Sequence, residues 1–326
     1  MFSIIIPLYN KAAYIEKAIS SVISQTCQEF EIIVVDDGSQ DLDKKALEKG
    51  FESTPLHDLA LLNDRAVYFR QQNQGVSVAR NNGVKCAKYP YICFLDADDW
   101  WKPTFLAEMK NLIESYPQAG IYGCRYQLFK AGRFKNTNIG LPADFEIGFI
   151  NYCEVYARTL SMPLWTGAVI IPKQIFDLED GFKSQLKLGE DFDLWIRIAL
   201  KYPVAFVNKV LAVYNQDVEL VNRAVVNHKL FEPSTHFIFN LEYLSGYESE
   251  NNELKILLDK LRVNSLLRYR YQNAYNKAVK SEINKIDFSQ QTFSTYLEFK
   301  LPQVLIIIWF KLRINIALYI KRLFNK

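Results

Sequence analysis

Acidic residues gather at three places in this chain of 326 residues. Asp37 lies in the segment DDGS, Asp96 and Asp98 lie in DADD, and Glu190 and Asp191 lie in GED. Carboxylates that are crowded together repel one another unless a cation or a polar ligand compensates them. A divalent ion held by one or two carboxylates and completed by phosphate oxygens is typical of Mg²⁺ and Mn²⁺ sites. The DDGS and DADD segments therefore predict a site for a metal ion and a phosphate-bearing ligand.

The first half of the chain alternates apolar runs with helical patterns. The runs predict buried strands at residues 3–7, 31–35, 66–70 and 91–95, and the patterns predict helices at residues 12–25, 40–50, 76–87 and 103–115. This alternation indicates an α/β fold with a doubly wound, mostly parallel sheet. Ligands of such sheets bind beyond the carboxyl ends of the strands, which is where DDGS and DADD lie.

Each acidic segment alone has an ordinary explanation. DDGS is most often a turn, because Asp, Gly and Ser are turn residues. A lone DxD pattern usually marks a solvated loop, and Asp191 at a helix start is equally explained as a cap. Several such segments at successive strand ends of one chain favour a shared site.

The second half predicts a mixed region followed by helices. Strands are expected at 121–129, 167–171, 204–207 and 210–214, with a helix at 191–201 between the second and third of them. Beyond residue 222 only helical patterns follow, at 227–243, 253–264 and 269–283. We therefore expect an α/β domain over residues 1–222 and a helical extension over 223–326.

The end of the extension, about residues 302–324, is an apolar segment interrupted by cations. Lys311 and Arg313 would lie near the middle of a membrane span, at a cost of roughly 2.5–3.5 kcal/mol each. Lys311, Asn315 and Arg322 share one helical stripe, which favours an amphipathic helix lying on a membrane surface. A helix packed on the protein's own core is the alternative.

Composition excludes several classes of protein. Hydrophobic residues make up 49% and charged residues 23%, as in ordinary globular proteins. The net charge of +3 and the lack of a basic run argue against nucleic acid as a partner. Five cysteines without a CxxC pair predict reduced thiols. Because the first residues run straight into a strand pattern, we expect no signal peptide and a cytoplasmic location.

Five blocks of the sequence together resemble family 2 glycosyltransferases, which have the GT-A fold. The resemblance covers about residues 1–215, in order, and stops before the helical extension. The blocks are SIIIPLYN at 3–10, VVDDGS at 34–39, NQGVSVARNNG at 73–83, FLDADDW at 94–100 and GEDFDLWIR at 189–197.

The resemblance implies roles for the residues that would hold the donor nucleotide. Pro7 and Tyr9 match the place where the base and ribose dock, and Asp37 matches the residue that accepts a hydrogen bond from a uracil ring N–H. UDP is favoured as the nucleotide on this ground alone. Arg80 matches a basic residue near the nucleotide, although a surface ion pair on its helix is the competing explanation.

The DADD block matches the DxD motif of the family. There Asp96 would lie nearer the ribose and Asp98 would bind Mn²⁺ or Mg²⁺, while Asp99 would support the loop. Asp217 stands where many family members carry a metal-binding His. Either its carboxylate replaces that imidazole, or the ligand is absent and water fills the position.

The GED block matches the acceptor side of the family's active site. Asp191 would be the general base that takes the proton of an acceptor hydroxyl, and Glu190 would orient the acceptor. The metal would neutralise the departing diphosphate on the opposite face, so the anomeric centre would invert. Trp165 and Trp195 offer faces for a sugar ring, although core packing is the commoner fate of Trp.

These expectations describe an inverting, metal-dependent glycosyltransferase. It would move one sugar from a UDP-sugar to a saccharide or lipid-linked acceptor in bacterial surface glycan synthesis, at the inner face of the cytoplasmic membrane. The chain has no QxxRW sequence, which favours a non-processive enzyme. A nucleotide-sugar-binding pseudoenzyme and a sugar nucleotidyltransferase are the alternatives, but the latter would show a Gly-rich phosphate loop after the first strand.

Overall fold

The computed structural model describes residues 1–42, 56, 58, 64–218, 230–302 and 305. Contacts between Cα atoms divide the chain into a first unit, Met1–Asn227, and a second unit, His228–Lys326. The expected domain boundary after residue 222 lies outside the described residues. So do most of the helix expected at 40–50 and almost all of the helix expected at about 302–324.

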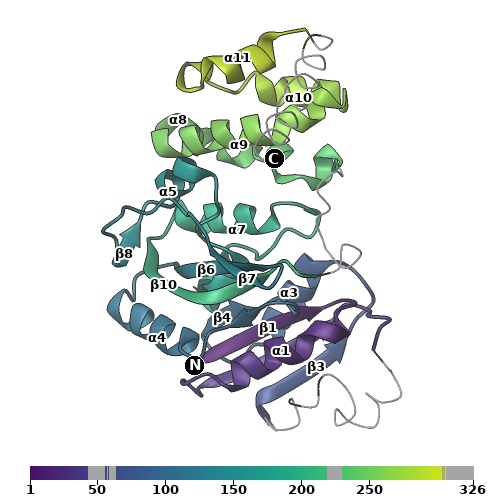
Figure 1. Ribbon diagram of the computed structural model, residues 1–326, viewed down its shortest axis with the longest axis vertical. Helices are drawn as coiled ribbons and strands as arrows, with labels where there is room; N and C mark the ends of the chain where they lie inside the picture. The colour runs from purple at the N-terminus through teal and green to yellow at the C-terminus, as the bar shows by residue number, and fades with distance from the viewer. Residues whose placement is uncertain (43–55, 57, 59–63, 219–229, 303–304, 306–326) are drawn as a thin grey trace, which may run out of the picture. The chain divides into compact units, whose positions relative to one another are not determined.

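The first unit is built on one mixed sheet (Figure 1). In its described part the strands are β1 Phe2–Leu8, β2 Phe30–Asp36, β3 Ala66–Arg70, β4 Tyr91–Phe94, β5 Trp100–Trp101, β6 Ile121–Lys130, β7 Arg133–Asn136, β8 Ile147–Ile150, β9 Val169–Pro172 and β10 Val204–Asn215. Their order is β3-β2-β1-β4-β9-β6-β10-β5, with β7 paired to β6 and β8 paired to β10. The mostly parallel α/β fold predicted from the sequence is confirmed.

Most of the long strands point the same way. β1 is parallel to β2 and β4, and β2 is parallel to β3. β9 is antiparallel to both β4 and β6, and β10 is parallel to β6. The carboxyl ends of β1, β2, β4, β6 and β10 therefore meet at one side of the sheet, called here the C-terminal edge.

Helices cover the sheet (Figure 1). Helix α3 packs closely on β1 and β2 because Gly83 has no side chain: a Cβ there would lie 2.4 Å from Ile5 and 3.2 Å from Val35. This close approach places the first turns of α3 beside the C-terminal edge. The helices of this unit are α1 Ala12–Ile23, α3 Val76–Cys86, α4 Phe105–Ser115, α5 Tyr152–Thr159, α6 Lys173–Leu178 and α7 Glu190–Ala199.

Three expectations for the secondary structure are wrong. The helix expected at 269–283 is interrupted, because one helix ends at Tyr271 and the next begins at Asn276. The two strands expected at 204–214 form one strand, β10, with register shifts between Val207 and Ala212. The helix expected at 227–243 is absent from its described part, where short 3₁₀ turns occur instead. Pro233 lacks the backbone N–H that a continuous helix needs. In addition, the Asn240 amide donates to the carbonyls of Pro233 and His236, and such local bonds compete with helix formation.

The second unit is helical, as expected. Its longer elements are α8 Ser245–Glu250, α9 Asn252–Tyr271, α10 Asn276–Ile283 and α11 Phe293–Lys300. Arg262 on α9 is 1% exposed and pairs with Glu248, Asp259 and Glu282. Because breaking such a buried network would leave charges unpaired, it fixes how α8, α9 and α10 pack. Among the described residues, no helix combines the length and apolar character needed to cross a bilayer.

Candidate active site

The ends of β1 and β2 lie side by side at the C-terminal edge. Leu8 is paired with Asp36, and its carbonyl accepts a hydrogen bond from the Asp37 amide at 2.7 Å. Pro7 is buried within β1, whereas the Tyr9 side chain just beyond it is 45% exposed. An exposed aromatic ring at this edge is available to stack on a nucleotide base.

Asp37 organises the loop between β3 and α3. Its carboxylate accepts hydrogen bonds from the Gln71 side chain at 2.8 Å and from the amides of Gln74 and Gly75 at 2.9 and 2.8 Å. It is only 3% exposed. The preceding Asp36 is fully buried and pairs with Arg70 at 2.8 Å. Asp37 therefore holds the loop between β3 and α3 in place, and its role at a nucleotide is still a prediction.

The DADD segment follows β4 and carries a built-in cation. The Lys11 ammonium lies 2.7 Å from Oδ2 of Asp98, and their side chains are 19% and 10% exposed. Burial raises the pKa of Asp98, and Asp96 adds to this effect while Lys11 opposes it. Burial by itself would lower the pKa of Lys11, but Asp98 and Asp96 outweigh it and raise that pKa. The ammonium is thus held charged between carboxylates.

Lys11 is held in place by its own loop. Asn10 just before it adopts a left-handed backbone with φ of 50°. The Asn10 amide donates to the Ser39 hydroxyl at 3.1 Å, and the Asn10 side chain accepts from the Gln40 amide at 2.8 Å. These bonds tie the turn between β1 and α1 to the DDGS turn. The position of the Lys11 ammonium is therefore determined by both strand ends.

Asp99 is the most deeply buried carboxylate of the segment, at 1% exposure. Its Oδ1 accepts from the Asn215 amide at 2.7 Å, which ties the segment to the end of β10. Its Oδ2 is buried and has no hydrogen-bond partner among the described residues. Burial, Asp98 and Asp96 raise the pKa of Asp99 well above its usual range. This support for the loop agrees with the predicted role.

Arg80 connects the DADD segment to the GED segment. Its guanidinium lies 2.8 Å from Asp96 and 3.3 Å from Glu190, and its side chain is 4% exposed. Burial alone would raise the pKa of Asp96, but the charges of Arg80 and Lys11 outweigh it and lower that pKa. Arg80 is therefore a buried link between the two acidic segments, and the surface ion pair considered as an alternative is not found.

Asp191 lies in the first turn of α7, directly after Glu190. Its carboxylate accepts a hydrogen bond from the Phe192 amide at 2.7 Å. Burial, with the neighbouring charge of Glu190, raises its pKa to about 7. A carboxylate with a pKa near neutral pH is suited to accept and release a proton. The charge of Asp191 also raises the pKa of three nearby phenols, after burial as the main cause: Tyr126, Tyr152 and Tyr156.

The carboxylates fit an open metal site. Within residues 1–42, 64–218 and 230–302, no three His, Cys, Asp or Glu side chains converge closely enough to hold a metal ion by themselves. Asp98 and Asp99 nevertheless supply hard oxygens with raised pKa values, and one buried oxygen of Asp99 has no partner. Sites of this kind take one or two carboxylates from the protein and complete the ion with substrate phosphates.

Among the described residues, the hydrogen bonds of the Asp217 carboxylate go to a hairpin turn and not to the DADD segment. Its two carboxylate oxygens accept hydrogen bonds from the amides of Ala131 and Gly132, at 2.6 and 3.1 Å. These amides form the turn between β6 and β7. Its predicted role as a metal ligand is therefore still a prediction. Trp195 is fully buried in the core, whereas Trp165 is half-buried.

Sequence reasoning missed Lys11 and the tyrosines around Asp191. Lys11 directly follows the block SIIIPLYN, so its proximity to the end of a strand was the only signal. Tyr126, Tyr152 and Tyr156 come from β6 and α5, far from GED in the sequence. No local pattern marks them.

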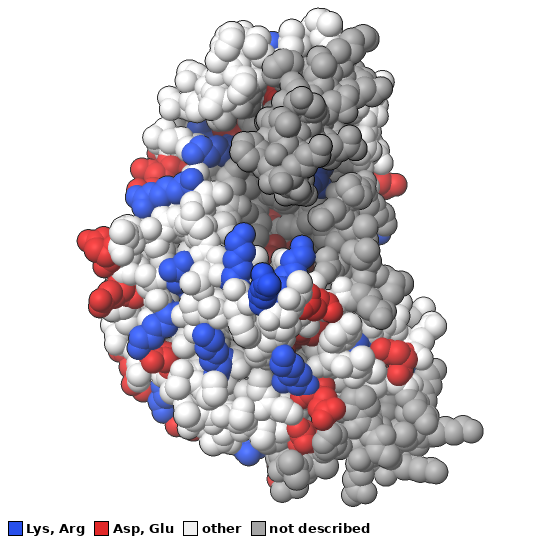
Figure 2. Space-filling model, in the orientation of Figure 1, with Lys and Arg blue, Asp and Glu red and all other residues white. Residues whose placement is uncertain are grey.

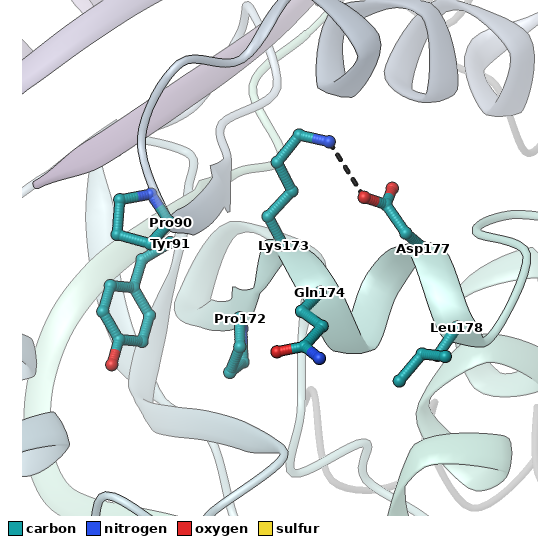
Figure 3. Close-up of a pocket in the computed structure, with 7 residues that line it drawn as sticks. All are labelled: Pro90, Tyr91, Pro172, Lys173, Gln174, Asp177 and Leu178. Atoms are coloured by element: carbon teal, nitrogen blue, oxygen red, sulfur yellow. Dashed lines mark hydrogen bonds and ion pairs between the residues drawn. The ribbon is translucent and has the colours of Figure 1, made fainter.

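A large open pocket lies away from these residues (Figure 3). Its volume is about 690 Å³, and it is lined by the start of β4, the end of β9 and helix α6. Lys173 and Asp177 form an ion pair at 2.9 Å on α6. Because Tyr91 in its lining begins β4, whereas the DADD segment follows the end of β4, the pocket lies at the opposite edge of the sheet.

Replacing Asp191 with Asn is expected to stabilise the protein more at pH 8 than at pH 5. The carboxyl pKa rises from 3.8 to about 7 on folding, so stability falls as pH rises between these values and the full penalty is present above pH 7. The gain should differ by on the order of 2 kcal/mol between the two pH values. Urea unfolding of the wild type and of Asp191→Asn at pH 5 and pH 8 measures this gain in the free energy of unfolding. An equal gain at both would contradict the raised pKa.

The fold and the arrangement of acidic residues at one sheet edge define the GT-A class. TarS of S. aureus, solved in complex with UDP-GlcNAc, superposes with a TM-score of 0.60 at 18% identity, covering 91% of this chain and 78% of that one. Residues 3–164 match the model of glycosyl transferase family 2. This match agrees with the resemblance that the sequence blocks predicted.

Curated relatives are also described as glycosyltransferases. An uncharacterized glycosyltransferase of Rickettsia felis is 29% identical over 232 residues, which cover 70% of this chain and 36% of that protein. One of Rickettsia typhi is 30% identical over 214 residues, covering 65% of this chain and 62% of that protein. The chain thus spans less than two thirds of the length of these relatives.

Proposed function

We propose that this chain is an inverting glycosyltransferase that transfers a single sugar from a UDP-sugar to a hydroxyl group of a saccharide or lipid-linked acceptor. The observation that carries this proposal is the chain of contacts from Asp96 through Arg80 to Glu190, beside Asp191 with its pKa of about 7. It couples the predicted donor side of the site to a carboxylate suited to act as general base.

Each residue has a task in this reaction. Tyr9 stacks on the base, and Asp37 keeps the loop before α3 in place at the nucleotide. Asp191 takes the proton of the acceptor hydroxyl as that oxygen attacks the anomeric carbon. Glu190, held by Arg80, orients the acceptor. Attack opposite the departing diphosphate inverts the anomeric centre.

The acidic donor side needs positive charge. Asp98 would hold Mn²⁺ or Mg²⁺, which would supply charge neutralisation for the departing diphosphate. Lys11 adds a second positive charge next to Asp98. Asp217 could also bind the metal ion only if its carboxylate gave up its hydrogen bonds to the amides of Ala131 and Gly132.

The expected setting is bacterial surface glycan synthesis at the inner face of the cytoplasmic membrane. The support is the amphipathic pattern of residues 302–324, which favours a surface-bound helix, and the lack of the QxxRW sequence, which favours one transfer per encounter. The family match supports a nucleotide-sugar donor.

Thermal unfolding in the presence of nucleotide sugars tests the proposal. A UDP-sugar with Mn²⁺ should raise the midpoint, because a ligand at about 100 times its Kd stabilises the folded state by about 2.7 kcal/mol. GDP- and dTDP-sugars serve as controls for the nucleotide. Stabilisation by none of them would contradict the proposal. Stabilisation without release of UDP, given a mixture of saccharide acceptors, would point to the pseudoenzyme instead.

A further inference from the structure

The hairpin of β6 and β7 carries an unusual surface at the C-terminal edge. Lys130, Arg133, Phe134 and Lys135 lie at its tip, and we call them the cationic hairpin. From residue 125 to residue 142 the chain has no Asp or Glu. Figure 2 shows Lys and Arg side chains grouped where β7 lies in Figure 1.

The register of the hairpin sorts its side chains onto two faces. Lys130 is paired with Arg133, and Phe129 is paired with Phe134. Because paired residues share a face and successive residues alternate, Lys130, Arg133 and Lys135 lie on one face. Phe129 and Phe134 lie on the other. The hairpin is therefore amphipathic, with all its cations together.

The aromatic face packs toward the DADD segment. The rings of Phe134 and Phe129 have centroids 5.0 Å apart, and those of Phe129 and Trp100 are 5.3 Å apart. Trp100 follows Asp99 directly in the sequence. The Lys17 ammonium lies 3.0 Å from the Trp100 ring and closes this cluster. The aromatic residues thus anchor the hairpin beside the candidate active site and leave its cationic face outward.

The cationic face is exposed and carries more positive than negative charge among the described residues. Lys130, Arg133 and Lys135 are all exposed, and none of them makes an ion pair within the described part of the chain. Like charges directly opposite each other, as in Lys130 and Arg133, destabilise a strand pair. Asp217 is the acidic group at this tip, and its carboxylate is bound to the turn amides, which fixes the turn. An anionic ligand would relieve the repulsion.

Strand β6 connects the hairpin to the neighbourhood of Asp191. Tyr126 on β6 lies near Asp191, and its ring is 5.0 Å from that of Trp165, which in turn is 5.2 Å from Tyr214. Four residues along β6 separate Tyr126 from Lys130, or about 13 Å. An acceptor chain whose end lies at Asp191 could pass these aromatic faces and reach the cationic hairpin.

We propose that the cationic hairpin binds anionic groups of the acceptor, so that this enzyme's acceptor is a glycan chain carrying phosphate or carboxylate groups a few units from the reacting hydroxyl. This inference rests on the proposed function and names its acceptor class. The aromatic side chains that lead from Tyr126 towards the hairpin favour a glycan chain over a bilayer surface as the occupant, and the 57% exposed Phe134 beside the cations makes the vesicle comparison below necessary.

Binding of dextran sulfate tests the proposal, with neutral dextran of the same length and vesicles of phosphatidylglycerol and phosphatidylcholine as comparison probes. The variant K130Q/R133Q/K135Q removes the cationic face. K85Q/K88Q/K209Q removes three exposed charges elsewhere on the first unit and is the matched control. The hairpin variant should bind dextran sulfate at least about tenfold more weakly, and the control variant less than about twofold. The affinity for neutral dextran should be the same for the wild type and for both variants.

Two results would overturn the proposal. One is equal weakening in both variants, which would show a general charge effect. The other is retained dextran sulfate binding with loss of vesicle binding in the hairpin variant, which would assign the surface to the membrane. Stabilisation by a UDP-sugar, measured on the same preparations, tests the proposed function separately, because the hairpin variant keeps all the predicted nucleotide-binding residues.

Discussion

Asp191→Asn should lower kcat by roughly 10³-fold while leaving nucleotide-sugar binding unchanged. The amide keeps the shape of the side chain but cannot accept the proton of the acceptor hydroxyl. In the wild type, kcat/KM should rise with pH through about 7, because the base works only after it has lost its proton and its pKa is about 7. Steady-state rates of UDP release between pH 5 and pH 9 measure both effects.

Asp193→Asn is the matched control on the same helix. Asp193 is 1% exposed and pairs with Lys183 at 2.7 Å and with Arg197 at 2.9 Å, so its loss should lower the thermal midpoint without a comparable loss of kcat. If the two variants lost activity in equal measure, the effect would be structural. The base assignment would also be refuted by an Asp191→Asn enzyme that keeps wild-type turnover at saturating acceptor.

Much of the donor side could be predicted because the rule for parallel sheets is local. Apolar runs mark the strands, and the residues after each run must lie at one edge, so Tyr9, Asp37 and Asp96 could be grouped from the sequence. Their hydrogen bonds could not. That Asp37 binds the amides of Gln74 and Gly75 depends on how the loop after β3 folds back, which no spacing encodes.

The acceptor side was harder because its contacts join distant elements. Asp191 lies near tyrosines of β6 and α5, and Arg80 reaches Glu190 from α3. The β6–β7 hairpin itself was not predicted, since four consecutive exposed residues in β7 give no alternation of apolar and polar positions. Its two faces follow from pairing with β6, and pairing is a property of the fold.

Asp98→Asn should weaken Mn²⁺ binding in the presence of UDP and lower kcat by at least about 10²-fold. An amide oxygen carries no charge, so it is a poorer ligand for the ion than a carboxylate. Electron paramagnetic resonance of free Mn²⁺, titrated with protein and UDP, measures binding independently of turnover. Unchanged Mn²⁺ binding in this variant would remove Asp98 from the metal site.

Lys11→Met separates the metal ligand from its ion pair. Either substitution breaks the contact of 2.7 Å between the Lys11 ammonium and Asp98. Only Lys11→Met keeps the carboxylate, now without a competing cation. It should therefore bind Mn²⁺ more tightly than the wild type, by about tenfold for a gain of about 1.4 kcal/mol. Equal weakening of Mn²⁺ binding in both variants would mean that the ion pair only holds the loop, because opposite shifts are required if ammonium and metal compete for one carboxylate.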